Sequence, residues 1–220
     1  MKLSLIILFC ICCHICLGQN NRQIRTIDSA FYATQIDSLR YLFGYNKKIQ
    51  IDYELSILIA LSYFPELDSS KIIFKKARSK TTANARPTTL SLLFRKRTKR
   101  VYVIRINYKQ KDSIVTLHEV FFNARIGLFG HELSHFIDYR GKNIFGITKR
   151  LLSYTNKKGK ERFEKEIDLM TVNRGLGWQL YDFAFYVLNE SDAKTRYKEF
   201  KKNIYLEPEE ISEIINKSWR

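Results

Sequence analysis

The sequence predicts an α+β fold in which a small β-sheet is followed by a helical half. Between about residues 71 and 117, short segments rich in Ile, Val, Leu and Phe are typical of strands. From Asn123 onward, apolar residues recur at helical spacing. The 220 residues contain no internal repeat or low-complexity linker, so we expect a single domain over residues 19–220.

Two helices are predicted ahead of the sheet. Residues 22–43 place apolar side chains at roughly helical spacing, and Gly44 is expected to end that helix. Asp52 is expected to cap a second helix. This helix should end near Phe64, because Pro65 disfavours helical geometry in the residue before it.

The sheet and the helical half follow. Strands are predicted at 71–77, 88–94, 100–107 and 113–117. The basic run RKRTKR at 95–100 separates two of them and is interpreted as a solvated hairpin turn. Helices are predicted at 123–139, 146–155, 160–174, 177–188 and 208–217, with Pro208 in the first turn of the last.

The amino terminus, MKLSLIILFCICCHICLGQN, has the layout of a secretory signal peptide. One positive charge at Lys2 precedes a largely apolar run over residues 3–18, and cleavage after Gly18 is expected. A signal anchor is the alternative, but the run is shorter than the roughly 20 apolar residues that span a bilayer. The next apolar run, at 55–64, is shorter still, so we expect an exported protein, periplasmic, cell-surface or secreted, without a transmembrane helix after the leader.

Cysteine and charge constrain the exported chain further. All four cysteines lie in the leader, so the fold must be stabilised by its apolar core and not by disulfides. Without Lys2, 37 basic and 22 acidic residues leave a formal charge of +15. Such a charge suggests an anionic surface or polymer as a partner. Nucleic acid is disfavoured, because neither an aromatic-interleaved RNA-binding signature nor zinc-finger spacing is present.

The stretch GHELSHFIDY at 130–139 contains the motif with the clearest chemistry. Histidines four residues apart project from one face of a helix, so His131 and His135 can bind one metal ion while Glu132 lies beside that ion as a base. Chance alone gives an HExxH in roughly one in 200 chains of this length. Glycines at 127 and 130 each destabilise a helix, so their presence needs a compensating reason. Close packing of another element around a metal site is one such reason.

A third ligand is expected from the segment KERFEKEIDLM at 160–170. Glu164 and Asp168 lie four residues apart, on one face and next to an apolar stripe, as a ligand and a carboxylate supporting a ligand histidine require. Glu164 ranks ahead of Glu166, which points to a nearly opposite face, and of Glu161, which is close to the helix start. Asp138 is two turns from His131 and is expected to have an ordinary polar role.

HELSH together with FEKEID resembles the HExxH and ExxxD pattern of gluzincin metallopeptidases. The phrase Phe-Glu-x-x-x-Asp is also found in CAAX-prenyl-protease-like members, and residues 121–186 resemble uncharacterised exported bacterial HExxH proteins. The resemblance implies a zincin-like domain with His131, His135 and Glu164 as Zn²⁺ ligands, Glu132 as general base, and Asp168 orienting a ligand histidine. Because the chain lacks membrane helices after the leader, CAAX-type substrates are not implied.

The leading functional hypothesis is therefore an exported zinc metallopeptidase that hydrolyses peptide or amide bonds of a protein or peptide substrate. An extended substrate is expected to pair with a sheet edge at 100–107 or 113–117. Tyr181, Arg174 and His118 are the candidates for stabilising the oxyanion. The alternatives are a catalytically silent metal-containing binding protein at the cell surface, and a basic surface-binding protein whose HELSH is accidental.

Overall fold

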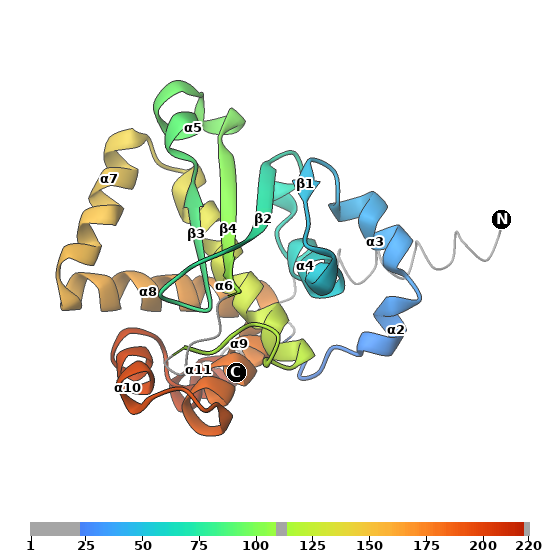
Figure 1. Ribbon diagram of the computed structural model, residues 1–220, viewed down its shortest axis with the longest axis vertical. Coiled ribbons are helices and arrows are strands. Elements are labelled where there is room, and N and C mark those ends of the chain that lie inside the picture. The colour runs from blue at the N-terminus through green and yellow to red at the C-terminus, as the bar shows by residue number, and fades with distance from the viewer. Residues whose placement is uncertain (1–22, 109–113, 218–220) are drawn as a thin grey trace.

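A computed structural model describes residues 23–108 and 114–217. The predicted signal peptide, 1–18, lies outside these residues. The described chain is α+β, with a four-stranded sheet in its first half and helices in its second (Figure 1). None of the described helices is both long and apolar enough to cross a membrane.

The sheet has the order β1-β2-β4-β3. Its strands are β1 (Lys47–Lys48), β2 (Lys71–Ala77), β3 (Ala83–Pro87) and β4 (Val101–Asn107). Strand β4 is parallel to β2 and antiparallel to β3, so β3 forms one edge. Pro87 is tolerated in β3 because edge strands can lack ladder hydrogen bonds.

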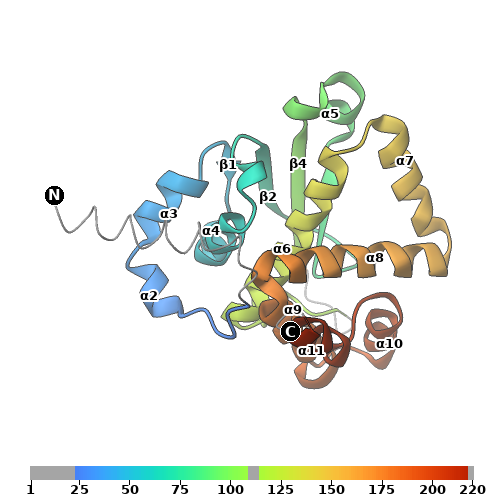
Figure 2. The same ribbon diagram turned by 180° about the vertical axis from the view of Figure 1, so that it is seen from behind.

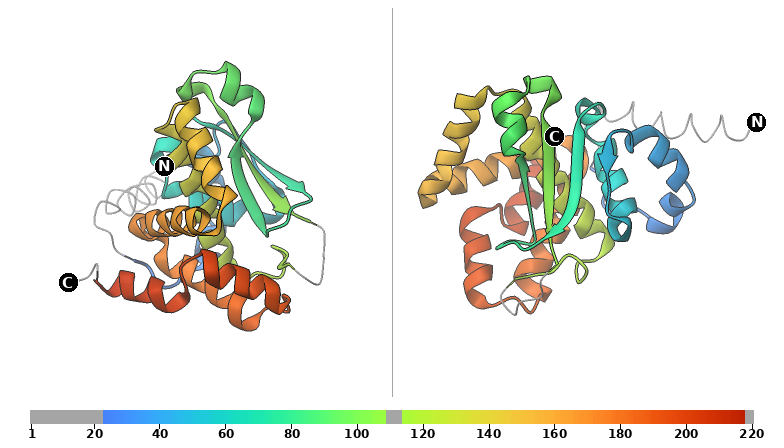
Figure 3. Two further views of the ribbon diagram at one scale, coloured as in Figure 1. Left: turned by 90° about the vertical axis from the view of Figure 1, so that its left-hand side faces the viewer. Right: turned by 45° about the horizontal axis from the view of Figure 1, so that its top comes forward.

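The helices before and within the sheet region are α2 (Ser29–Ala33), α3 (Ile36–Phe43), α4 (Glu54–Ser62) and α5 (Thr89–Phe94). Those that follow are α6 (Phe122–Arg140), α7 (Ile144–Leu152), α8 (Lys157–Thr171), α9 (Gly177–Phe185), α10 (Thr195–Ile204) and α11 (Pro208–Lys217). Helix α6 crosses the centre of the molecule between the sheet and the later helices (Figure 3). It packs on the sheet through ring contacts of Phe129 with Phe74 and of Phe136 with Tyr102.

Two glycines allow α9 and the turn before it to pack closely on α6. A Cβ atom at Gly127 would lie 2.1 Å from the backbone oxygen of Gln179, and one at Gly130 would lie 2.6 Å from Leu176 Cδ1. The predicted crowding at these positions is present, but it comes from helix packing and not from the metal site itself. The turn before α9 contains Gly175 with a φ of 92°, a conformation that L side chains rarely adopt.

The predicted strands at 88–94 and 113–117 were wrong. Residues 89–94 form helix α5, because a short apolar run does not by itself distinguish a strand from a helix. The strand beside β4 is instead β3, whose sequence ANARP has little intrinsic strand propensity and is held by pairing. Residues 114–117 form only an isolated bridge at Ile114. The basic run at 95–100 is consequently a short connection from α5 to β4 and not a hairpin turn.

The single helix predicted at 22–43 is two helices. The Asp28 side chain caps the start of α2, and the backbone leaves helical geometry at Gln35 (φ −113°, ψ 13°), directly before α3. Gly44 ends α3 as predicted. Asp52 caps no helix and pairs with Lys76 instead, although α4 does end shortly before Pro65. The five later helices were confirmed to within a few residues, with Pro208 at the start of α11, whereas α10 was missed.

Candidate metal centre

Helix α6 buries the HELSH motif in the interior. The residues His131, Glu132 and His135 are each no more than 5% exposed. The neighbouring helix α8 is amphipathic and turns Phe163, Glu164 and Ile167 toward α6. Two carboxylates of α8, Glu164 and Asp168, are as deeply buried as the histidines, and buried charges of this kind require partners.

The histidines and Glu164 converge on one point. The Nε2 atoms of His131 and His135 lie 3.2 Å and 3.4 Å from Glu164 Oε2. The three residues form a buried group whose ligand atoms all lie within 4.8 Å of one another, so they could hold a metal ion. All three predicted ligands therefore lie in one place.

The donor set fits a zinc ion. Tetrahedral zinc with Zn–N and Zn–O bonds of roughly 2.0–2.2 Å places its ligand atoms about 3.3–3.5 Å apart. The two observed separations of 3.2 Å and 3.4 Å agree with that spacing. Glu164 Oε2 is buried without a hydrogen-bond partner, as is expected of a carboxylate oxygen that binds a cation.

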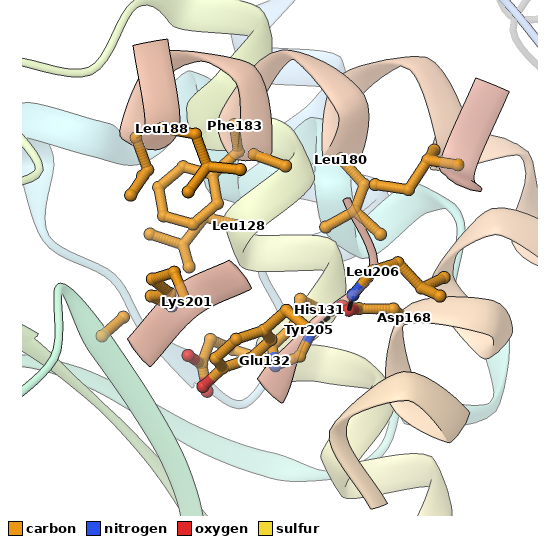
Figure 4. Close-up of a pocket in the computed structure, with 14 residues that line it drawn as sticks. Leu128, His131, Glu132, Asp168, Leu180, Phe183, Leu188, Lys201, Tyr205 and Leu206 are labelled. Atoms are coloured by element: carbon orange, nitrogen blue, oxygen red, sulfur yellow. Dashed lines mark hydrogen bonds and ion pairs between the residues drawn. The ribbon is translucent and has the colours of Figure 1, made fainter. Parts of the chain in front are cut away.

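Asp168 fixes the orientation of His131. Its Oδ1 atom lies 2.7 Å from His131 Nδ1, a geometry in which Nδ1–H donates to the carboxylate and Nε2 is turned toward Glu164. The second oxygen, Oδ2, accepts a 2.9 Å hydrogen bond from the backbone N–H of Leu206 (Figure 4). One buried carboxylate therefore joins a candidate ligand to the segment after α10.

Tyr154 holds the other oxygen of Glu164. The Tyr154 hydroxyl donates a 2.5 Å hydrogen bond to Glu164 Oε1. Burial raises the pKa of Tyr154, so this hydroxyl stays protonated and remains a donor. The contact leaves Oε2 as the oxygen that faces the histidines, which suits a carboxylate that binds through one oxygen.

Glu132 lies beside this group at a narrow pocket. Its Oε2 atom is buried without a hydrogen-bond partner, and burial raises the pKa of its carboxyl. The pocket has a volume of about 40 Å³, enough for a few water molecules. Lys201 and Tyr205 also line it (Figure 4), and Lys201 Nζ lies 3.9 Å from the centre of the Tyr205 ring.

The pKa values of His131 and Glu164 are strongly shifted by their neighbours. Burial lowers the pKa of His131, but Asp168 and Glu164 outweigh that effect and raise the pKa to about 10. For Glu164, burial acts to raise the pKa, but His135 and His131 outweigh it, so the pKa lies well below its usual value. A cation at this site would replace the imidazole proton as the partner of the carboxylates.

The residues ranked lower in the sequence lie outside the group. Asp138 pairs with Lys142 and Arg150, the structural role expected of it. Glu166 points away, is 44% exposed and pairs with Arg150. Glu161 lies 3.7 Å from Lys165 at the start of α8.

The three oxyanion candidates also lie elsewhere. Arg174 pairs with Glu66, the ring of Tyr181 stacks on Phe185, and His118 contacts Thr116. None of these candidates lines the pocket at Glu132. The sequence analysis missed Tyr154, Lys201 and Tyr205. The helical spacing of Tyr197, Phe200 and Ile204 could have indicated α10 and so drawn attention to Lys201 and Tyr205.

Comparison of the chain with protein-family models, with curated proteins and with solved structures found no match. The site's own geometry is therefore what supports a function.

Proposed function

We propose that this chain is an exported zinc metallopeptidase with a zincin-like domain. The observation that carries the proposal is the convergence of His131 Nε2, His135 Nε2 and Glu164 Oε2 beside the unpartnered carboxylate of Glu132. Binding a metal requires the first three residues but not Glu132. A carboxylate at that position is what hydrolysis by a metal-bound water needs.

His131, His135 and Glu164 would hold the ion, with Asp168 and Tyr154 keeping two of these ligands in place. A bound zinc ion would supply a Lewis acid for the scissile carbonyl and lower the pKa of a coordinated water. Glu132 would accept the proton of that water and pass it to the leaving amine. Burial raises the pKa of Glu132 toward neutral pH. A carboxyl with such a pKa can both accept a proton from the water and release it to the leaving amine.

A protein or peptide substrate would lie along the β3 edge. The expectation that 100–107 forms the edge was wrong, because β4 is paired on both sides. Strand β3 is the edge strand next to α6, and its residue Ala83 lines the pocket at Glu132. An extended peptide could add to this edge by backbone hydrogen bonds. The apolar walls formed by Leu128, Leu180 and Phe183 would favour an apolar substrate side chain.

A second function is favoured by the closure of the site. The pocket holds about 40 Å³, far below the roughly 300–1,000 Å³ of typical ligand pockets. A chain that keeps this conformation would hold a metal but admit no peptide. It would then be a metal-containing binding protein at the cell surface, or a peptidase that opens only under a further stimulus.

The deciding experiment compares wild type with Glu132→Gln at matched zinc content, against a mixed peptide library. Cleavage that the wild type performs and the variant loses would support the peptidase. Zinc bound to both proteins without cleavage by either would support the binding function. Wild-type protein purified without any bound metal would contradict both functions.

A further inference from the structure

We propose that α5 and the basic connection after it form a docking surface for an anionic lipid bilayer. The surface consists of the apolar side chains Leu90, Leu93, Phe94 and Phe145 with the basic side chains Arg95, Lys96, Arg97 and Lys99, and we call it the α5 patch. It lies apart from the metal centre, and the proposal does not depend on catalysis.

Helix α5 is packed with its apolar face outward. Leu90, Leu93 and Phe94 are 73%, 55% and 79% exposed, and their spacing places them on one face of the helix. The inward side carries Leu92, which packs against the core, and Ser91, whose Oγ accepts a 3.0 Å hydrogen bond from Val101 N at the start of β4. Three of the four large apolar side chains of α5 therefore face solvent, as is typical of a surface that contacts an apolar partner.

Helix α7 adds a fourth apolar side chain at the same end of the molecule. The amino end of α7 lies beside α5 at that end (Figures 1 and 2), and Asn143 and Ile144 line one groove with Leu93 and Lys96. Phe145, the next residue, is 79% exposed. The exposed apolar side chains thus come from two elements.

The basic side chains beside this face have no internal role. Arg95, Lys96, Arg97 and Lys99 are all exposed, and within the described parts of the chain they form no ion pair. The sequence contains 12 basic and no acidic residues between positions 69 and 108, and none that is acidic between 139 and 160. Four free cations beside apolar side chains match a surface that offers anionic headgroups above acyl chains.

The patch is also rigidly joined to the rest of the fold. The buried Arg100 donates hydrogen bonds of 3.1 Å and 2.8 Å to the backbone oxygens of Tyr139 and Lys142, at the end of α6. Docking through the patch would therefore hold the molecule at a fixed angle to the bilayer, with the carboxyl end of α6 nearest to it.

The test places a fluorescent reporter on the patch in the full chain. Phe94→Trp is compared with Tyr41→Trp, at an 84% exposed position on α3, using vesicles whose acyl chains carry bromine as a quencher. We expect vesicles rich in phosphatidylglycerol to quench the Phe94→Trp variant and not the Tyr41→Trp variant. Phosphatidylcholine vesicles should quench neither. Because each variant contains the same leader, membrane contact elsewhere in the chain does not produce this difference.

Charge removal provides the second arm. Changing Arg95, Lys96, Arg97 and Lys99 to Gln in the Phe94→Trp background should weaken the phosphatidylglycerol response on the order of 100-fold or more. The matched control changes Lys158, Arg162, Lys194 and Arg196 to Gln and should leave the response intact, because these two lysines and two arginines on and beside α8 and α10 are also exposed and form no ion pair within the described residues. Equal circular-dichroism spectra and equal melting temperatures of all variants would show that the fold is preserved. No quenching of the Phe94→Trp variant would overturn the proposal, as would equal quenching of both reporters or equal effects of the two charge sets.

Discussion

At the scale of single residues, the candidate metal centre contains two buried carboxylates that are held by named partners. Glu164 illustrates this: Tyr154 holds Oε1, while Oε2 faces two imidazoles. Asp168 likewise uses both oxygens. Within the described residues, three buried atoms of the site have no hydrogen-bond partner: Glu164 Oε2, Glu132 Oε2 and His135 Nδ1. The two oxygens lie where the proposed chemistry needs free electron pairs, whereas the ring of His135, unlike that of His131, has no hydrogen bond at Nδ1 to orient it.

Glu164→Ala is predicted to abolish tight zinc binding, because it removes one of three ligands, whereas Glu166→Ala should not. The two residues lie on the same helix, but Glu166 is 44% exposed and faces Arg150. Zinc bound per chain after gel filtration, measured by mass spectrometry, tests this. Equal zinc content in the two variants would rule out Glu164 as a ligand.

Asp168→Ala is predicted to weaken zinc affinity about 10- to 100-fold, as the loss of a carboxylate that orients a ligand histidine typically does. Competition with a chelating dye would give the affinity. Asp182→Ala is a suitable control, because Asp182 is also largely buried and pairs with Arg25 away from the site. If both variants bound zinc as wild type does, Asp168 would have no part in the metal centre.

At the scale of elements, the contact between α6 and α9 depends on the absence of a side chain. A methyl group at Gly127 would meet backbone atoms of Gln179, which cannot move without moving α9. The helix that carries HELSH and the helix that lines its pocket are therefore held at very short range.

Gly127→Ala is predicted to destabilise the fold by about 1–3 kcal/mol or more, through forced separation of the two helices. Gly141→Ala provides the control, because no atom lies within 4 Å of the added methyl group. Its effect should stay within about 0.5 kcal/mol. Urea unfolding followed by circular dichroism gives both free energies of unfolding. An unchanged stability for Gly127→Ala would show that α9 shifts freely.

The comparison of sequence with structure is informative at this scale too. Helices α6 and α8 were predictable because their apolar positions repeat at helical spacing, and the metal group followed from the spacing of HELSH and of Glu164 with Asp168. Strand β3 was not predictable, because its residues are held by pairing with β4 and not by propensity. Tyr154 was missed for a related reason: its partner Glu164 is brought to it by the packing of a turn on α8.

At the scale of the whole molecule, a basic, acid-poor sheet region is followed by a helical half that contains most acidic residues of the later chain. The apolar core is shared by both halves, since α6 contacts the sheet on one side and α8 and α9 on the other. Loss of a metal bound at the proposed site should therefore affect the stability of the whole domain.

Metal removal is predicted to lower the melting temperature. The folded state would lose the free energy of metal binding, and two histidines and a carboxylate would stay buried without the cation. Differential scanning fluorimetry with and without EDTA, followed by zinc restoration, measures the change. Glu164→Ala should melt at the same temperature in both conditions. A wild-type melting temperature that EDTA leaves unchanged would contradict a structural contribution of the metal.

The Asp168 carboxylate has a thermodynamic consequence of its own. Asp168 Oδ1 contacts His131, and Oδ2 accepts a hydrogen bond from the Leu206 amide. If the proposed ion binds, its occupancy and the ordering of the chain at 205–206 would therefore be linked, and each would favour the other by the same free energy. Stripping the ion should therefore speed tryptic cleavage at Lys201 and Lys202, and a ligand that pulls this segment away should release the ion. The rate of cleavage near residues 205–206 would then measure the fraction of molecules that hold the ion.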